Sequence, residues 1–446
     1  MNEILRAEKD WDELLLQHPP SIEAAEQRQQ QLDLWMDGRP VCGVMRPQFV
    51  TREMMQTDAR VSETVLSAIH KACDWLRRNP AMSELYLGPS LAMYGPLMDY
   101  QRGYSQECVF GRLDAYRTPK GLRFLEYNAG MAGGFTRGAD LATYFEGLPS
   151  FAAFQDRHPV SHQAVMPRLL EALLEAWTDW GGQGQPDIVV LMPKAMLKLP
   201  AVVTTVQAAL RYFSEQGVPA RVVDPIELEF DGKFLRQGAE PVRMVLRAFL
   251  VELAGEGIKP LMQALKAGAV CMVNPFSLNG HKAVFDVLTD FSLELGYTAE
   301  ERQVVEEHVP WTRLVRPTRT QGLDGSQVDL LDHALSNQHR LVLKAAVSLG
   351  GKDVMLGWRM PADEWRKALE TAVSDRYWVV QDKLELVGST FPQLATGFPP
   401  MQAHLDCCPL LIGGRFAGYM TRLSPGEITN VSSGGSSLPT FILESK

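Results

Sequence analysis

The sequence predicts a mixed fold with α+β and α/β parts, and three observations lead to this class. Residues 3–37 and 62–78 place apolar side chains at helical spacing, residues 111–128 alternate like a hairpin, and apolar runs alternate with helical segments from residue 188 onward. The 446 residues exceed one typical core, so we expect roughly two or three subdomains. The predicted order is a helical N-terminal region, a hairpin, a Rossmann-like central αβ subdomain and a strand-rich C-terminal part.

The composition is that of a soluble globular protein, with 46% hydrophobic and 22% charged residues. The net charge of −9, from 44 basic and 53 acidic residues, argues against non-specific binding of nucleic acid. No apolar run reaches the length of a membrane span, and residues 1–6 lack the order of a secretory signal, so we expect a cytoplasmic location without membrane contact. The six cysteines show no metal-binding spacing and predict reduced, mostly buried thiols.

The N-terminal region reads as helical. Residues 3–37 form two helices interrupted at His18-Pro19-Pro20, and residues 46–49 form an extended entry to a helix over residues 62–78. Asn79-Pro80 should end that helix, because proline restricts the residue before it. Helices therefore precede strands in this chain.

Residues 111–118 and 122–128 predict two antiparallel strands around the loop Pro119-Lys120-Gly121, which suits a type I turn followed by a left-handed glycine. If Thr118 closes against Leu122, one face carries three opposed pairs and the other face is apolar. The expected pairs are Tyr116 with Phe124, Asp114 with Glu126, and Arg112 with Asn128, and the expected core face is Leu113, Ala115, Leu125 and Tyr127.

The polar face of this hairpin suits a cation. Opposed Asp114 and Glu126 destabilise a sheet, and burying them unpaired would force one to bind a proton. Their carboxylates and the Asn128 amide are oxygen donors of the kind that Mg²⁺ prefers, which leaves Arg112 for an anion. The glycines within residues 129–134 would let backbone N–H groups approach a ligand. The alternative is a solvated face with a surface ion pair.

The central part predicts two β-α-β units with right-handed crossovers. Asp224 ends a strand as an acidic residue does in dinucleotide folds, but no GxGxxG precedes it, which argues against a nicotinamide site. The predicted elements are a helix over 162–180, a strand over 188–192, a helix over 200–216, a strand over 220–223, and strands over 243–249 and 270–273 around a helix over 258–267.

A further helix should begin within residues 274–282 and run to Thr289, capped by Asn279 or the loop glycine, with Lys282 in its first turn. A cation there opposes the helix dipole and indicates a nearby anion. An exposed lysine is the alternative. Residues 316–327, polar and with glycines, read as a linker.

The C-terminal segment holds a second set of candidate residues. A strand over 340–344, a glycine loop over 348–352 and a returning strand over 353–357 could enclose phosphates, with Lys344 and Lys352 as point charges. The loop is not a Walker A motif.

Two more features follow downstream. The strand over 378–383 ends in polar residues and is expected to offer edge backbone groups to a base. A hairpin over 410–423 turns at Gly413-Gly414 and ends at Arg422, and residues 429–436 form a second glycine-containing loop. For both glycine loops, a plain surface connection is the alternative.

The order of these segments carries a resemblance. RLD, LEYNA, NP…HK, VPWTR, VLK…GGK, VVQDK and RLS…TNVSSGG follow one another as in the circularly permuted ATP-grasp superfamily, which includes glutathionylspermidine synthetase and the eukaryotic-type glutathione synthetases. The resemblance spans residue 111 to the C-terminus. Together with the helical region read from the pattern of residues 1–100, it predicts three further segments: a metal-site hairpin over 101–150, a central αβ subdomain over 151–290, and nucleotide-binding ATP-grasp subdomains over 291–446.

The resemblance also implies roles for individual residues. Arg112 becomes the catalytic arginine at the transferring phosphate, and Asp114, Glu126 and Asn128 become Mg²⁺ ligands. The remaining assignments are nucleotide binding for Lys282, Lys344, Gly350, Gly351, Lys352, Gln381, Asp382 and Lys383, and substrate binding for Arg422 and Asn430.

The implied activity is a carboxylate–amine ligase that uses ATP and Mg²⁺, expected as a pair of ions, and joins an amino acid or short peptide to a small amine through an acyl phosphate. Its partners would be small molecules only, and the oligomeric state, including a homodimer, stays open. Two alternatives remain: a nucleotide-binding protein that has lost turnover, and an ATP-dependent phosphotransferase.

One departure argues against a eukaryotic-type glutathione synthetase proper. Those enzymes continue the VLK strand with a proline and a loop glutamate, whereas Ala345 and Ser348 stand here. Asp114 would then replace the missing carboxylate. No amidase half is evident in the sequence.

Overall fold

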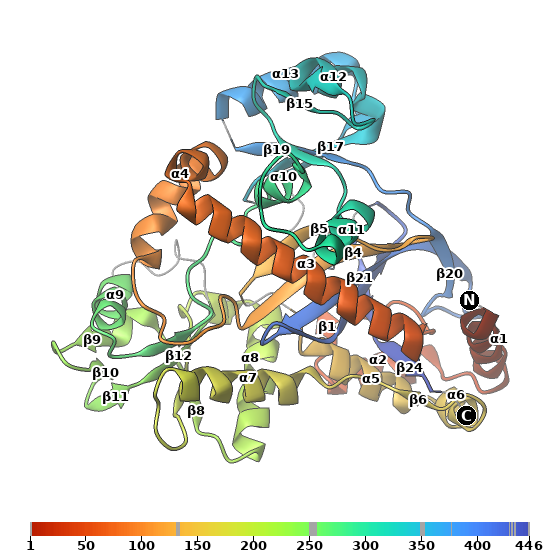
Figure 1. Ribbon diagram of the computed structural model, residues 1–446. Helices are drawn as coiled ribbons and strands as arrows, with labels where there is room; N and C mark the ends of the chain where they lie inside the picture. The colour runs from red at the N-terminus through yellow and green to blue at the C-terminus, as the bar shows by residue number, and fades with distance from the viewer. Residues whose placement is uncertain are drawn as a thin grey trace.

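A computed structural model describes residues 2–130, 134–248, 257–347, 353–375, 377–427, 429, 431 and 434–444. Its main sheets are a mostly hairpin-built sheet of order β23-β22-β21-β4-β5 with β20 on β21, a parallel sheet of order β13-β12-β7-β8, and an antiparallel sheet of order β14-β19-β17-β18. Figure 1 shows the parallel sheet at the lower left, the antiparallel sheet at the top and the long helix α3 across the front. None of the described helices is both long and apolar enough to cross a membrane.

The N-terminal region is helical, as predicted. It contains α1 (Asn2–Gln17), α2 (Ile22–Gln31), the short strand β3 (Gln48–Thr51), α3 (Arg52–Arg78) and α4 (Pro80–Met98), with the two-stranded β1 (Trp35–Met36) and β2 (Arg39–Pro40) between. Helix α3 begins earlier than predicted because the Thr51 side chain accepts a hydrogen bond from the Met54 amide and caps it. It ends before Asn79-Pro80, as expected.

The hairpin of β4 (Phe110–Thr118) and β5 (Gly121–Ala129) forms with part of the predicted register. Arg112 faces Asn128 and Asp114 faces Glu126, as predicted, and Gly121 takes the expected positive φ of 101°. Thr118, however, closes against Gly121 rather than Leu122, since its hydroxyl bonds both the Lys120 amide and the Gly121 carbonyl.

This tighter turn is absorbed by a bulge in β5, where the register shifts beyond Asp114. The predicted pairing of Tyr116 with Phe124 is therefore wrong: Tyr116 faces Arg123, and Phe124 faces Ala115. Placing Leu125 on the core face is also wrong, because the bulge leaves it half-buried.

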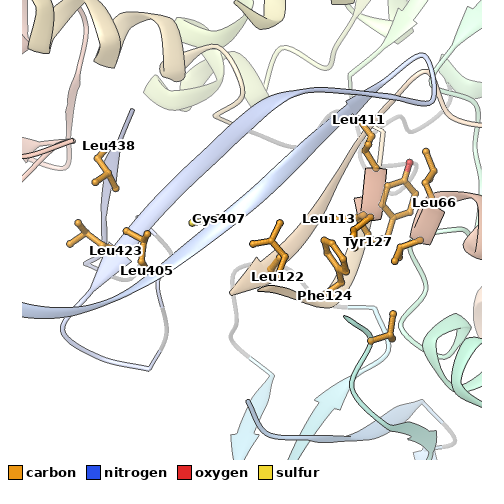
Figure 2. Packing of buried hydrophobic residues seen from close by; sticks show 14 of the residues in the cluster. Leu66, Leu113, Leu122, Phe124, Tyr127, Leu405, Cys407, Leu411, Leu423 and Leu438 are labelled. Atoms are coloured by element: carbon orange, nitrogen blue, oxygen red, sulfur yellow. The ribbon is translucent and has the colours of Figure 1, made fainter. Parts of the chain in front are cut away.

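The apolar face of the hairpin packs into the largest core cluster. Leu122 and Phe124 are fully buried there beside the predicted Leu113, Ala115 and Tyr127. Figure 2 shows Leu113, Leu122, Phe124 and Tyr127 in this cluster together with Leu66, which lies on α3. The labelled neighbours are Leu66, Leu405, Cys407, Leu411, Leu423 and Leu438.

The C-terminal hairpin completes the same sheet. β21 (Pro400–Ile412) pairs with β22 (Arg415–Ser424), with β20 (Gly388–Pro392) and antiparallel with β4, and β23 (Ser436–Leu438) pairs with β22. The turn at Gly413-Gly414 is as predicted, with φ values of 59° and 75°. The strands are longer than predicted, so the two hairpins lie side by side although they are far apart in sequence.

The chain returns to its N-terminal region at the end. β24 (Thr440–Leu443) pairs parallel with β3 and antiparallel with β6 (Val160–Ser161). In Figure 1, β24 therefore lies at the same end of the molecule as α1. The helices α5 (Arg137–Glu146), α6 (Pro149–Arg157) and α7 (Val165–Asp179) connect this region to the central part.

The parallel sheet confirms the two predicted β-α-β units. β7 (Ile188–Leu191), α8 (Pro200–Glu215) and β8 (Ala220–Val223) form the first, and β12 (Met244–Arg247), α9 (Ile258–Lys266) and β13 (Cys271–Val273) form the second. The strand order reverses between β7 and β12, and open α/β sheets bind ligands beyond the carboxyl ends of the strands at such a point. A small antiparallel sheet of β9 (Leu228–Phe230), β10 (Leu235–Gln237) and β11 (Glu240–Val242) lies between the units in sequence.

The antiparallel sheet comes last. It is built from β14 (Thr312–Leu314), β17 (Leu341–Ala345), β18 (Val354–Leu356) and β19 (Trp378–Asp382), preceded by α10 (Val284–Thr289) and α11 (Ala299–His308) and accompanied by α12 (Leu330–Ser336) and α13 (Ala362–Asp375). The predicted linker over residues 316–327 is wrong. It forms the hairpin of β15 (Arg319–Gln321) and β16 (Gln327–Asp329), whose turn uses a positive φ of 84° at Gly325.

All six cysteines are unpaired and buried, as predicted. The adjacent Cys407 and Cys408 lie on β21, and burial raises the pKa of the Cys407 thiol to about 12. These thiols therefore act as packing groups.

Candidate active site

The polar face of the hairpin carries an arginine–carboxylate pair. Arg112 and Asp114 lie two residues apart on β4 and therefore point to the same side. Arg112 Nε donates to Asp114 Oδ1 at 2.5 Å and Nη2 donates to Oδ2 at 3.1 Å. This two-pronged geometry fixes the guanidinium plane as well as its position.

A second arginine reaches the same carboxylate from the C-terminal hairpin. Arg422 on β22 faces Asp406 on β21, donates from Nε to Asp406 Oδ2 at 2.8 Å, and donates from Nη2 to Asp114 Oδ2 at 3.0 Å. The Thr429 hydroxyl also donates to Asp406 Oδ2, at 2.6 Å. Asp114 is thus held between two guanidinium groups.

The charge on Asp114 is therefore stabilised by the protein itself. Burial opposes the charged form, but Arg112 and Arg422 hold the pKa of Asp114 well below its usual range. Asp406 lies deeper, and burial raises its pKa despite the neighbouring Arg422. The electrostatic conflict between Asp114 and Glu126 that the sequence indicated is resolved here by arginine.

Glu126 has a different partner. Its Oε2 lies 3.2 Å from Lys282 Nζ, and the Asn128 amide Nδ2 lies 3.4 Å from Oε1 and 3.0 Å from Asp114 Oδ1. The Glu126 side chain is 25% exposed, more than that of Asp114 at 14%. Glu126 is thus the more accessible carboxylate of the pair.

These side chains include oxygen donors of the kind that a hard cation such as Mg²⁺ takes, and Glu126 is the more exposed of the two carboxylates. The Asn128 amide nitrogen lies within hydrogen-bonding reach of both carboxylates, and carboxylate oxygens are donors that suit Mg²⁺. Asp114 already accepts four hydrogen bonds, from Arg112, Asn128 and Arg422, and would have to exchange one to bind a metal. No group of three His, Cys, Asp or Glu side chains in the described part of the chain could hold a metal ion.

Lys282 lies beside the Glu126 carboxylate, but not in the predicted helix. α10 begins at Val284 with no side-chain cap, so placing Lys282 in its first turn with Asn279 as cap is wrong. The reason is a long-range bond: the Lys282 amide donates to the Ala346 carbonyl at 3.0 Å, which holds this segment against the end of β17. The alternative of an exposed lysine is also excluded, since its side chain is only 9% exposed.

Lys344 lies on β17 with its ammonium group buried. Nζ donates to Gln381 Oε1 at 2.7 Å. Burial lowers the pKa of Lys344 to about 8, and the nearby Glu126 offsets part of that shift. Lys344 and Lys282 thus approach the hairpin carboxylates from two different segments.

The prediction that the strand over residues 378–383 offers edge backbone groups to a base is wrong, because this strand is not at the edge of its sheet. β19 lies between β14 and β17, and the amides of Asp382 and Lys383 donate to the carbonyls of Trp311 and Arg340. The Asp382 carboxylate pairs with Arg340, at 3.2 and 2.8 Å. A role for these residues at the base stays a prediction.

Comparison with solved structures decides the fold. No family model matches the chain, and no curated protein matches its sequence. A glutathione synthetase-like effector from Globodera pallida superposes with a TM-score of 0.62 at 14% identity, covering 95% of this chain and 96% of that one.

The chain has an ATP-grasp-related fold.

Two further structures match less closely. A protein from Methylobacillus flagellatus assigned as a gamma-glutamylcysteine synthetase has a TM-score of 0.42 at 12% identity, over 89% of this chain and 90% of that one. A RimK domain ATP-grasp protein from Sphaerobacter thermophilus has a TM-score of 0.25 at 14% identity, over 58% of this chain and 92% of that one. These scores are too low to add to the assignment of an ATP-grasp-related fold.

Four predicted site residues lie outside the described residues: Gly350, Gly351, Lys352 and Asn430. The others divide into two groups. The structure brings together Arg112, Asp114, Glu126, Asn128, Lys282, Lys344, Gln381 and Arg422 through the contacts above. By contrast, Asp382, the last residue of β19, pairs with Arg340, and Lys383, which follows it, lies over the Trp358 ring.

Asp406 is a site residue that sequence reasoning missed. It sits in an apolar run, LDCCPLL, and a lone carboxylate in such a run signals a buried partner. That partner, Arg422, is reached only through the pairing of β21 with β22.

Arg247 is the second site residue that the sequence analysis did not predict. It ends the buried strand β12 at the switch point of the parallel sheet, where Nε donates to the Asn274 carbonyl at 2.7 Å and the guanidinium lies 4.5 Å from the Phe276 ring centre. A Cβ on Gly130, at the end of β5, would lie 3.5 Å from Arg247 Nη2, so the hairpin end and the switch point adjoin. The signal was a charged residue at the carboxyl end of a buried parallel strand.

Proposed function

We propose that this protein is an ATP- and Mg²⁺-dependent carboxylate–amine ligase that forms an amide between an amino acid or short peptide and a small amine or amino acid. One observation carries the proposal. Lys282 and Lys344, from segments far from the hairpin in sequence, converge on the face that bears Asp114, Glu126 and Asn128. An ATP-grasp-related fold with cations around oxygen donors suits phosphoryl transfer.

The chemistry follows from the substrates. A carboxylate is a poor electrophile, so ATP phosphorylates it and ADP leaves; the amine nitrogen then attacks the acyl carbon of the acyl phosphate, expels phosphate and loses a proton. In this proposal Lys282 and Lys344 bind nucleotide phosphates, and Arg112 stabilises charge on the transferring phosphoryl group. Mg²⁺ would supply further neutralisation of phosphate charge, held by Glu126, Asn128 and Asp114, once Asp114 has given up one of its hydrogen bonds.

The position of Arg247 supports the proposal that one substrate carries a carboxylate. Its guanidinium lies at the switch point of the parallel sheet, beside Gly130 at the end of the hairpin. A carboxylate bound there would lie next to the phosphoryl-transfer residues, as the acyl phosphate step needs. Arg422 and Asn430 stay proposed substrate residues, and Arg422 would have to share its donors with Asp114 and Asp406.

The order of the elements supports a circularly permuted arrangement. The hairpin β4–β5 precedes the antiparallel sheet of Lys344 and Gln381 in the chain, yet the two adjoin through Gln381, whose Nε2 lies 3.2 Å from the Leu125 carbonyl.

The test is substrate-dependent ADP formation. The protein is mixed with Mg·ATP and pairwise combinations of amino acids, dipeptides and small amines, and active pairs are analysed by mass spectrometry. The expected product is an amide. A phosphate ester or a released acyl phosphate would identify a phosphotransferase instead, and Mg-dependent ATP binding with no ADP across the panel would identify a nucleotide-binding protein without turnover.

A further inference from the structure

The side chain of Gln381 makes a complete set of hydrogen bonds. It is buried, with Oε1 accepting from Lys344 Nζ at 2.7 Å and Nε2 donating to the Thr312 hydroxyl at 2.9 Å and to the Leu125 carbonyl at 3.2 Å. An amide NH₂ has two hydrogens, so both are used. Gln381 therefore has no side-chain donor left with which to read a base.

The chemistry of its neighbours fixes the orientation of this amide. Lys344 has only donors, and the Leu125 carbonyl has only lone pairs. A flipped amide would place NH₂ against the Lys344 ammonium and oxygen against the Leu125 carbonyl, and both contacts would be repulsive. The oxygen must therefore face Lys344.

Lys344 depends on this oxygen. The ammonium group is buried, and burying a charge without a hydrogen-bond partner is costly. The Gln381 oxygen lies within hydrogen-bonding distance and compensates part of that cost. It also defines where the ammonium points, because a lysine side chain is otherwise flexible.

The other end of the amide reaches the hairpin at its irregular point. Leu125 is the extra residue of the β5 bulge, and its neighbour Glu126 is the principal candidate metal ligand. A bulged residue is left out of the ladder, so its carbonyl is available to Gln381. The Gln381 amide thus connects Lys344, the strand β14 and the hairpin β4–β5.

We propose that Gln381 is a positioning residue that holds the Lys344 ammonium at the nucleotide phosphates and locks the antiparallel sheet onto the metal hairpin. The inference rests on the proposed function in one respect, that Lys344 binds nucleotide. It replaces base recognition by Gln381 with an action through Lys344.

The test is a double-mutant cycle on nucleotide affinity. The Kd for Mg·ATP is measured by calorimetry for the wild type, Gln381→Leu, Lys344→Met and the double variant. Each single substitution should weaken binding about tenfold, the scale of a hydrogen bond to a charged group. The double variant should bind no more than about twofold worse than Lys344→Met, because Gln381 acts through Lys344. Additive losses would overturn the proposal.

Two further variants separate positioning from stability. Gln381→Glu keeps an oxygen for Lys344 but loses both donors, so it should lower Tm as Gln381→Leu does while losing less nucleotide affinity. Thr312→Val is the matched control: it removes one bond of Gln381 without touching Lys344, and affinity should stay within about threefold of wild type. If Gln381 were only a structural residue, the loss of nucleotide affinity would follow the loss of Tm in all variants, and that result would also overturn the proposal. Because Gln381→Glu and Thr312→Val do not depend on Gln381→Leu, the test stays decisive if Gln381→Leu does not fold.

Failure of this inference and failure of the proposed function give different results. If the wild type binds Mg·ATP and the cycle shows coupling, but no amide forms with any substrate pair, the positioning role stands and the ligase assignment falls. If an amide forms but the losses in the cycle are additive, the ligase assignment stands and the positioning role of Gln381 falls. A wild type without Mg·ATP affinity would overturn both.

Discussion

Arg422 donates a hydrogen bond to Asp114 across 3.0 Å although 308 residues separate the two in the chain. Because Arg112 also donates to both oxygens of the same carboxylate, Asp114 is neutralised by arginine before any metal binds. Glu126, paired with Lys282 and more exposed, is left as the carboxylate best able to meet a cation. The two opposed carboxylates should therefore respond differently to substitution.

Glu126→Gln should lower substrate-dependent ADP formation by about 100-fold, the scale of losing one charge-stabilising group, while changing Tm little. Asp114→Asn should instead lower Tm strongly, since an amide NH₂ would meet the guanidinium groups. The measurements are turnover over a Mg²⁺ titration and thermal unfolding. Equal turnover for Glu126→Gln and wild type would remove Glu126 from the metal site.

Arg112→Ala should reduce turnover more than it weakens Mg·ATP binding, because a group that stabilises the transition state alone changes kcat rather than affinity. Arg422 still pairs with Asp114 in this variant, which keeps the carboxylate partnered. Steady-state kinetics and calorimetry on the same preparation give both numbers. A loss confined to affinity would make Arg112 a binding residue.

Asp406→Asn should lower the free energy of unfolding by roughly 3 kcal/mol, the low end of the cost of breaking a buried ion pair, because Arg422 keeps Asp114 as a partner. Asp406 and Arg422 side chains are only 3% and 8% exposed. Thr429→Val is the control and should cost less, about 1.5 kcal/mol, since it removes one hydrogen bond to the carboxylate but leaves the ion pair. Urea denaturation compares the two, and equal effects would show that Asp406 is not paired as described.

Asp286 should give stability a pH dependence. Burial raises its pKa from 3.8 to about 6, with Arg313 offsetting part of the shift. The folded state then holds a proton that the unfolded state releases, so this group's contribution falls by roughly 3 kcal/mol as pH rises from about 4 to 6.

The difference between wild type and Asp286→Asn isolates that slope. The difference is needed because burial lowers the pKa of His281 from 6.5 to about 4, which makes stability rise with pH over nearly the same range. Unfolding free energies at a series of pH values provide the measurement. A pH-independent difference would show that Asp286 is charged at pH 5 in the fold.

Gly280→Ala should displace the Lys282 segment from the hairpin. A Cβ at Gly280 would lie 2.9 Å from the Tyr127 carbonyl oxygen and 3.3 Å from the Ala129 amide nitrogen, and both are backbone atoms that cannot rotate away. We expect a cost of about 1–3 kcal/mol and weaker Mg·ATP binding. Gly95→Ala, whose Cβ would meet nothing closer than 3.9 Å, is the control: because Gly95 lies in α4, it should raise stability by about 0.5–1 kcal/mol and leave Mg·ATP binding unchanged.

Much of the local structure could be predicted because it depends on neighbouring residues. The helical N-terminal region, the two β-α-β units and the pairings of Arg112 with Asn128 and Asp114 with Glu126 all follow from short-range periodicity and turn chemistry. The division into segments 1–100, 101–150, 151–290 and 291–446 stays a prediction.

The errors share a cause, which is a long-range contact that overrides a local pattern. The Lys282 amide bonds to Ala346 instead of starting a helix, and β19 is enclosed by β14, which no pattern within residues 378–383 reveals. The bulge at Leu125 shifted the remaining register and freed the carbonyl that Gln381 binds.

The sequence by itself determined that Arg112, Asp114, Glu126 and Asn128 share one face of the hairpin, and that Asp114 and Glu126 needed positive charge, because strand alternation and like-charge repulsion act between near neighbours. Only the tertiary structure decided what supplies that charge. Arg422, Lys282 and Lys344 reach the hairpin through strand pairings and loops spanning much of the chain, and the energy of such contacts depends on the folded core rather than on any local pattern.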